Sequence, residues 1–271
     1  MAIITITRGS LSATARITDK LAARLGYRAV SREEAIKHGE KYGIDEFRLA
    51  AVATMEKQPP TWWDRHAIQR THYLMVLKAA LMDFAVEGNL IYHGNLGQYL
   101  LSDVPNLIRI RVDADFDSRV ETLMKEVGLS RAEAQAHIAD IDNRRGRWVK
   151  FLYGADFTDS ANYDLILNMA KMSPDVMADV IACLVKQPVF EMDDAAKKKL
   201  RDIRLKSLVE AHLVRSPRTR GMELDIECDA DAGLVNISGH GPAIGVDTWT
   251  KDIKGVLSDV EGLSDLDIKV Q

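Results

Sequence analysis

The first segment that could do chemistry is the turn between the first apolar run and the first helical pattern. Residues 3–8 read IITITR and residues 9–16 read GSLSATAR. A strand, a tight turn and a helix N-terminus in this order direct backbone N–H groups and the positive end of a helix dipole toward one point, which favours phosphate binding. The alternative is an ordinary turn capped by a serine hydroxyl. The candidate phosphate-binding residues are Gly9, Ser10, Ser12, Ala13 and Thr14.

Basic side chains gather in a second segment, residues 142–148, which reads DNRRGRW. Taken alone, it is typical of a solvated helix end, where cations offset the negative end of the helix dipole. Nucleic-acid binding has little support, because Trp148 is the one aromatic residue within the run and the formal net charge of the chain is -4. We therefore expect a small-molecule partner and no nucleic acid.

The composition is that of a globular protein large enough for two domains. Among 271 residues, 46% are hydrophobic and 28% are charged. We expect no membrane span and no export signal, and hence a cytoplasmic location. Cys183 and Cys228 lack metal-ligand spacing, so we interpret both as buried thiols and expect no zinc site.

Strand and helix patterns alternate through the first part of the chain. Strands are expected over residues 3–7, 89–95, 106–112 and 163–169, and helices follow them, including one over 65–87. Capping boxes at Ser31 with Glu34 and at Ser130 with Glu133 mark two helix starts, and Pro174 opens a further helix. This order predicts an α/β fold with a mainly parallel sheet and helices on both faces.

The pattern changes after residue 188. A charged helix, two alternating strands, an amphipathic helix and a last strand follow, which together indicate a small α+β unit. We therefore predict one domain over residues 1–188 and a second over 195–271.

The order of parts in the first domain resembles the cytidylate-kinase-like proteins of the P-loop nucleoside monophosphate kinase group. ITITR, LSAT, ITDKLA and LGY stand where that family has its first strand, a GSGG turn and the following helix. SREEAI, DSRVETLMKE, DNRRGRW and NYDLILNM match further pieces, including the basic lid and the last core strand. The likeness covers roughly residues 3–186.

The resemblance implies a P-loop kinase-like sheet and phosphoryl transfer from ATP, with Mg2+, to CMP or a related monophosphate. It implies that residues 9–14 cradle ATP, that Arg119 lies beside the adenine, and that Arg145 and Arg147 close on the phosphates from the lid. It further implies that Asp142 and Asp164 orient these arginines or a substrate, and that Arg32 meets the monophosphate.

Several family positions are altered in this chain. The P-loop lysine position falls on Thr14 and the magnesium-binding hydroxyl position on Ala15. Leu11 and Ala13 replace turn glycines, which adopt positive φ angles freely. Related kinases have a Gly-Arg pair where this chain has Gly94 and Asn95. The alternative to a kinase is therefore a catalytically degenerate protein that binds or senses a nucleotide.

The second domain resembles a BON domain. RSPRTRG, ELDIEC, GLVNISG and VEGLSDLDIKV occupy the places of that family's helix end, strands and last turn, with glycines at strand ends. The resemblance implies a docking module that contacts a lipid or a small ligand, whereas structural support of the first domain is the simpler alternative. The sequence leaves open the nucleotide base, the ligand of this domain and the oligomeric state.

Overall fold

The structure is a computed structural model that describes residues 1–8, 11–47, 65–94, 96–239 and 246–270. Trp62, Trp63 and Asn95 lie outside the described residues. The elements of the first part are β1 (Ile3–Arg8), α1 (Leu11–Leu25), β2 (Arg28–Ser31), α2 (Arg32–Gly39), η1 (Glu40–Tyr42), η2 (Ile44–Phe47), α4 (Arg65–Glu87), β3 (Leu90–His93), α5 (Gly97–Leu100), β4 (Leu107–Asp113), α6 (Phe116–Val127), α7 (Arg131–Tyr153), η3 (Ser160–Asn162), β5 (Leu165–Asn168) and α8 (Pro174–Val185). They are followed by η4 (Pro188–Phe190), α9 (Asp194–Arg215), β6 (Leu224–Asp229), β7 (Leu234–Gly239), α10 (Val246–Leu257) and β8 (Asp265–Val270).

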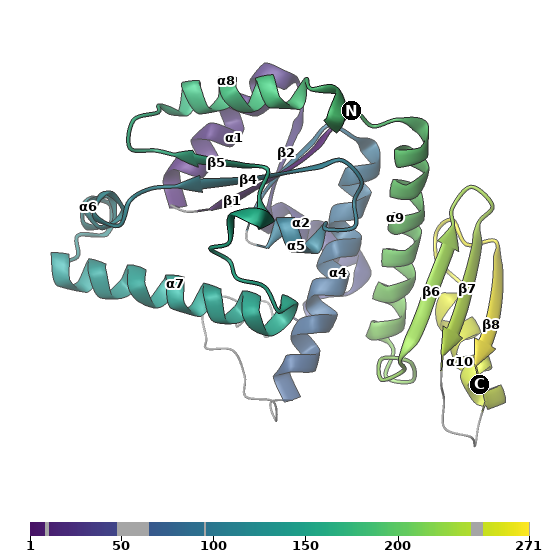
Figure 1. The fold of residues 1–271 in the computed structure, drawn as a ribbon. Helices are drawn as coiled ribbons and strands as arrows, with labels where there is room; N and C mark the ends of the chain where they lie inside the picture. The colour runs from purple at the N-terminus through teal and green to yellow at the C-terminus, as the bar shows by residue number, and fades with distance from the viewer. Residues whose placement is uncertain (9–10, 48–64, 95, 240–245, 271) are drawn as a thin grey trace.

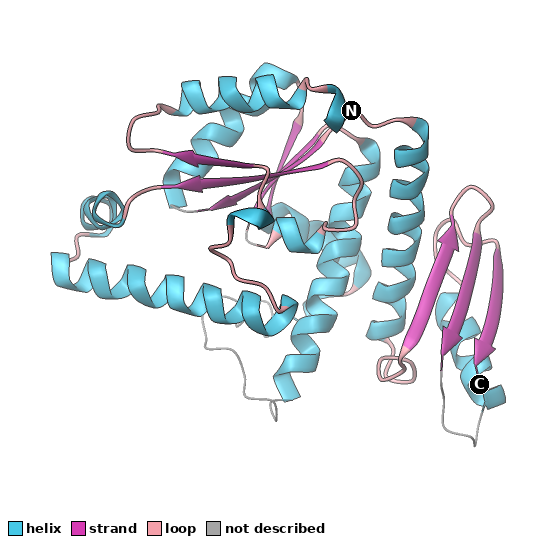
Figure 2. Ribbon diagram, in the orientation of Figure 1, coloured by secondary structure: helices cyan, strands magenta, loops and turns pink. Residues whose placement is uncertain are grey.

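The first part of the chain forms a five-stranded sheet in the order β2-β3-β1-β4-β5. All four pairs of neighbouring strands are parallel, and helices lie on both faces, as Figures 1 and 2 show. Parallel strands covered on both faces are apolar along most of their length, which explains the run IITI of β1 and the run LIY of β3. The predicted α/β class is confirmed.

The two faces of the sheet have different coverings. Ile4 and Ile6 of β1 belong to a buried cluster with residues of α1 and α8. Ile3 and Leu90 belong to a second buried cluster, which includes residues of α4 and α9. Because side chains alternate along a strand, Thr7 shares the second face with Ile3.

Local capping fixes several helix starts as predicted. Ser31 and Ser130 each form a full capping box, with Glu34 and Glu133 respectively. Ser173 accepts a hydrogen bond from the Val176 N–H ahead of α8, whose first residue is Pro174. The turn after β1 is a correction: α1 already begins at Leu11, so residues 12–14 lie in its first turn and not in an open loop.

The C-terminal part has the predicted order of helix, strand, strand, helix and strand. β6 pairs antiparallel with β7, and β7 pairs parallel with β8. Helix α9 lies beside α4 (Figure 1), and residues of both helices belong to one buried cluster. The three-stranded sheet is therefore joined to the five-stranded sheet through a shared helix pair.

A buried carboxylate ties α4 to its neighbours. The Asp83 side chain is 7% exposed and lies 2.7 Å from Lys41 Nζ and 2.8 Å from Arg204 Nε. Tyr42 donates a hydrogen bond to the same carboxylate, and His38 Nε2 lies 2.9 Å from it. Burial alone would raise the pKa of Asp83, but these hydrogen bonds outweigh it and lower the pKa to about 2. Asp83 thus connects α2 and η1 with α9.

The two thiols differ from the prediction that both are buried. Cys183 is exposed, because it lies on the outward side of α8, and Cys228 on β6 is half-buried. Burial raises the pKa of Cys228 to about 12. Among the helices of the described ranges, none combines the length and the apolar character that a membrane span requires.

Candidate active site

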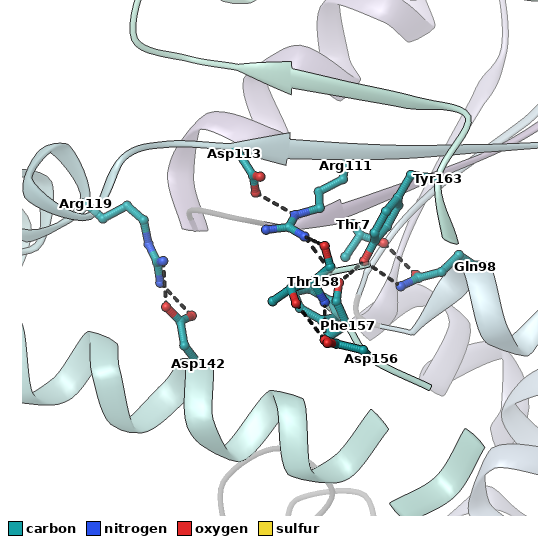
Figure 3. Close-up of polar contacts among 10 residues, drawn as sticks. All are labelled: Thr7, Gln98, Arg111, Asp113, Arg119, Asp142, Asp156, Phe157, Thr158 and Tyr163. Carbon is teal, nitrogen blue, oxygen red and sulfur yellow. Dashed lines mark hydrogen bonds and ion pairs between the residues drawn. The ribbon is translucent and has the colours of Figure 1, made fainter. Parts of the chain in front are cut away.

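Polar side chains from five elements meet on the α4 side of the sheet, toward the carboxyl ends of β1 and β4. Figure 3 shows Thr7 of β1, Gln98 of α5, Arg111 of β4, Arg119 of α6 and Asp142 of α7, together with residues of the segment that follows α7. The carboxyl edge is where open parallel sheets bind their ligands.

A buried hydrogen-bond chain fixes the floor of the group. Thr7 Oγ1 donates to Gln98 Oε1 at 2.6 Å, and Gln98 Nε2 donates to the Tyr163 hydroxyl at 3.3 Å. That hydroxyl donates to the Phe157 carbonyl at 3.1 Å (Figure 3). Thr7 and Gln98 are 1% and 3% exposed, so few water molecules compete for these hydrogen bonds. The hydrogen bonds therefore hold the 157–163 segment against β1.

Arg111 is held in a fixed orientation at the end of β4. Its Nε donates to Asp113 Oδ1 at 2.7 Å, and its Nη1 donates to the Phe157 carbonyl at 3.2 Å. The guanidinium carbon lies 5.2 Å from the centroid of the Phe157 ring and 5.6 Å from that of Tyr163. A longer contact of 3.5 Å joins Nη1 to the Thr158 carbonyl. Arg111 is therefore a largely buried cation whose direction is set by one carboxylate, two carbonyls and two rings.

Arg145 of α7 approaches the same ring. Its guanidinium carbon also lies 5.2 Å from the Phe157 centroid. Burial lowers the pKa of Arg145; the charge of Asp142 opposes this, whereas the charges of Arg119 and Arg111 lower it further. The structure therefore brings Arg111 and Arg119 within electrostatic range of Arg145, and we call these three residues the arginine cluster.

Arg119 and Asp142 form a bidentate pair between α6 and α7. The two guanidinium nitrogens donate to the two carboxylate oxygens at 2.7 and 2.8 Å (Figure 3). Parallel hydrogen bonds of this type fix geometry as well as adding energy. Both residues were singled out from the sequence, where Asp142 was expected to orient an arginine.

The two predicted lid arginines do not act from one side of α7. Arg147 is exposed, and two residues along a helix correspond to a rotation of about 200°. Arg145 shares its side of the helix with Asp142 and with buried Trp148, three residues before and after it. The arginine cluster therefore includes Arg145 and excludes Arg147.

Arg32 and Asp164 lie apart from the arginine cluster. Arg32 opens α2 directly after the carboxyl end of β2, and its Nη2 lies 3.3 Å from the Tyr73 hydroxyl. Asp164 directly precedes β5, and it accepts hydrogen bonds from the backbone N–H and the guanidinium of Arg109 at 2.8 to 3.1 Å. Because the amino end of β5 lies opposite the carboxyl edge, Asp164 orients Arg109 and not a member of the cluster.

The turn that was predicted to bind phosphate lies partly outside the described residues. Gly9 and Ser10 lie outside the described residues, whereas Ser12, Ala13 and Thr14 belong to the first turn of α1. Thr14, at the lysine position, is fully buried. The first turn of α1 contains no acidic residue, so no acidic side chain there offsets the positive end of the helix dipole.

Sequence reasoning missed Thr7, Gln98, Arg111 and Phe157. One signal was present for Arg111: the strand LIRIRVD alternates buried apolar residues with charged ones. A charged residue in a strand that is covered on both faces needs a buried partner, so it marks a polar site. Gln98 and Phe157 carry no comparable local signal. The hydrogen-bond partners of Gln98 lie 65 and 91 residues away in the sequence, so no local pattern reveals them.

Comparison with known proteins identifies related sequences. The model of a family described as the cytidylate kinase-like family matches residues 3–171. A cytidylate kinase of Pyrococcus horikoshii is 30% identical over 125 residues, which are 45% of this chain and 62% of that protein. Those of Ignicoccus hospitalis and Pyrococcus furiosus are 25% and 26% identical, over 67% and 74% of this chain and 97% and 96% of the relatives.

Solved structures show a weaker likeness. A protein of Eubacterium ventriosum is 19% identical, with a TM-score of 0.49 over 68% of this chain and 97% of that one. A shikimate kinase of Bacteroides thetaiotaomicron is 9% identical, with a TM-score of 0.41 over 69% of this chain and 100% of that one. These scores are too low to add to the assignment from sequence.

Proposed function

Since the chain belongs to the cytidylate kinase-like family, we propose that it is a nucleoside monophosphate kinase that transfers a phosphoryl group from ATP to CMP or a related monophosphate. The observation that carries this proposal is the arginine cluster, in which two guanidinium groups lie 5.2 Å from one Phe157 ring and a third is held by Asp142 beside them. Three cations gathered at a carboxyl sheet edge suit a ligand that carries several negative charges.

Phosphoryl transfer depends mainly on positioning and charge neutralisation. The charge in the transition state is spread over the oxygens of the moving group, so fixed cations stabilise it without reorganising. Asp113 and the Phe157 carbonyl already fix Arg111, and Asp142 fixes Arg119. In our proposal an incoming phosphate relieves the repulsion among the three cations, and the guanidinium groups take over the role of the absent P-loop lysine.

The two nucleotides would occupy different parts of the carboxyl edge. The α1 N-terminus, with residues 9–14, would hold the phosphates of ATP, and Arg119 would lie toward its base. Arg32 stands at the end of β2, on the other side of β1 from β4, and would bind the monophosphate. In the sheet, β3 and β1 lie between β2 and β4. The reacting phosphates would therefore meet near the carboxyl end of β1.

Magnesium fits this chain only as part of the substrate. The family's hydroxyl position is Ala15, which offers no ligand atom, and the Asp113 carboxylate is already paired with Arg111 at 2.7 Å. In the described parts of the chain, no three His, Cys, Asp or Glu side chains gather in a metal-binding arrangement. Mg2+ usually retains several waters and binds through substrate phosphates. We therefore expect Mg2+ to enter the site bound to the phosphates of ATP.

Two substitutions on one helix test the role of the cluster. Arg145→Gln removes a member of the arginine cluster, whereas Arg147→Gln removes a charge from the other side of α7. By analogy with other transition-state arginines, we expect Arg145→Gln to lower kcat/KM by at least ~100-fold and Arg147→Gln by less than ~3-fold. Equal effects of the two changes, with both variants folded by circular dichroism, would contradict the assignment.

A second candidate is a nucleotide-binding protein that has lost transfer. Buried Thr14 at the lysine position and Ala15 at the hydroxyl position favour it. In this proposal the C-terminal unit, with its BON-like sequence, would dock a partner or bind a ligand and receive the signal through α9, which shares a buried cluster with α4. Nucleotide binding by calorimetry without formation of a diphosphate product would favour this candidate.

A further inference from the structure

A cavity lies where the C-terminal unit meets the end of α4. Its volume is about 410 Å3, and its wall combines Met1, Val86 and Leu200 with residues of α9, of the β6–β7 turn and of the turn before β8. Small-molecule sites typically range from about 300 to 1,000 Å3 and join an apolar lining to a few polar groups. The cavity is therefore of ligand size, and it lies outside the arginine cluster.

One face of α9 supplies three cations to this wall. Lys197, Arg201 and Arg204 follow one another at intervals of four and three residues, so they project from the same side of the helix. Leu200 and Leu205 lie beside them on the helix and form part of the apolar wall. Among the described residues that line the cavity, Glu261 is the single carboxylate, and it pairs with Arg204 at 3.0 Å. The lining thus combines an apolar wall with three cations, each of which is paired with a carboxylate.

The ion pairs of these cations differ in how readily a ligand could replace them. Arg201 pairs with Asp231, and both side chains are 47% exposed. Lys197 pairs with Asp194, whose side chain is 98% exposed. Exposed pairs contribute little stability, so an anion could take the place of either carboxylate at small cost. Arg204 is different, because buried Asp83 holds it at 2.8 Å and Glu261 at 3.0 Å.

We propose that this cavity binds a small organic anion with an apolar body, such as a medium-chain carboxylate. The apolar part would lie against Met1, Val86 and Leu200, and the charged end would meet Lys197 and Arg201. The proposal does not depend on the kinase activity, since none of these residues belongs to the arginine cluster.

Calorimetric titration of the full chain with sodium octanoate tests the proposal. We expect saturable binding with one site per chain, and inorganic phosphate and octanol to bind at least ~10-fold more weakly, because each offers only half of the required chemistry. Absence of octanoate binding, or equal binding of inorganic phosphate alone, would overturn the proposal.

Variants locate the site. Ala230→Phe places a ring in the cavity from the β6–β7 turn, and the double change Lys197→Gln with Arg201→Gln removes two cations; each should weaken octanoate binding at least ~10-fold. Arg218→Gln is the matched control, because Arg218 pairs with Asp252 on the same unit, is 75% exposed and does not line the cavity. Circular dichroism checks the fold of each variant. Octanoate affinity that is unchanged in both test variants, or reduced as much in the control, would contradict the assigned site.

Discussion

Removal of the buried charge at Asp83 should destabilise the whole chain. Asp83→Asn keeps the shape of the side chain but removes the buried carboxylate charge that Arg204 and Lys41 share. The pKa of Asp83 falls from 3.8 to about 2 in the folded chain, and at 1.36 kcal/mol per unit this corresponds to roughly 2 kcal/mol. Arg204 keeps a second partner, Glu261 at 3.0 Å, so we expect a loss of about 2–3 kcal/mol at neutral pH.

Urea unfolding followed by circular dichroism measures this loss. With an m value near 3 kcal/mol/M, the midpoint should fall by about 1 M. Asp175→Asn is the matched control: Asp175 also pairs with two cations, Lys20 and Arg24, but its side chain is 55% exposed, and its substitution should leave the curve almost unchanged. An Asp83→Asn variant with the same urea midpoint as the wild type would show that the buried carboxylate does not stabilise the fold.

The pH dependence supplies an independent check on Asp83. Because its pKa is lower in the folded chain than in the unfolded chain, its contribution is complete above the unfolded value of 3.8 and is lost as the pH falls toward about 2. The difference in unfolding free energy between wild type and Asp83→Asn should therefore shrink over this interval. A difference that stays constant down to about pH 2 would show that the charge of the Asp83 carboxylate is not its cause.

Two further predictions concern Thr7 and the two cysteines. Thr7→Val keeps a β-branched side chain in β1 but removes the donor to Gln98 Oε1; because the acceptor stays buried, urea unfolding should show a loss of about 1–3 kcal/mol, and an unchanged midpoint would contradict this. Exposed Cys183 should react with Ellman's reagent in the native protein, whereas half-buried Cys228, whose pKa is raised to about 12, should react only after unfolding. Cys183→Ser identifies the fast thiol, and two equally fast reactions would refute the assignment.

Local signals in the sequence predicted the elements of the fold. The capping boxes at Ser31 and Ser130 join residues that are three positions apart, so both partners can be recognised within one short segment of the sequence. The strand order and the packing of α9 on α4 depend on contacts across the chain, which no local pattern encodes. One indication was present: Asp83 interrupts the apolar run of α4, and a lone carboxylate in such a run requires a partner elsewhere.

The candidate site was predictable to a similar extent. Arg119, Asp142 and Arg145 were identified from the sequence, and the structure brings them together with Arg111. The pairing of Arg119 with Asp142 joins residues 23 positions apart on two helices, so it depends on how α6 packs on α7. The family resemblance placed Arg147 beside Arg145 in the lid, whereas helical geometry separates the two side chains.

Direct assay of phosphoryl transfer tests the central proposal. The purified full chain is incubated with CMP and ATP in the presence of Mg2+, and CDP and ADP are separated and quantified, with samples that lack CMP or protein as controls. We expect equal amounts of CDP and ADP, which appear only when both nucleotides and the protein are present. Binding of both nucleotides by calorimetry without any CDP would contradict it and would favour a protein that senses the nucleotide.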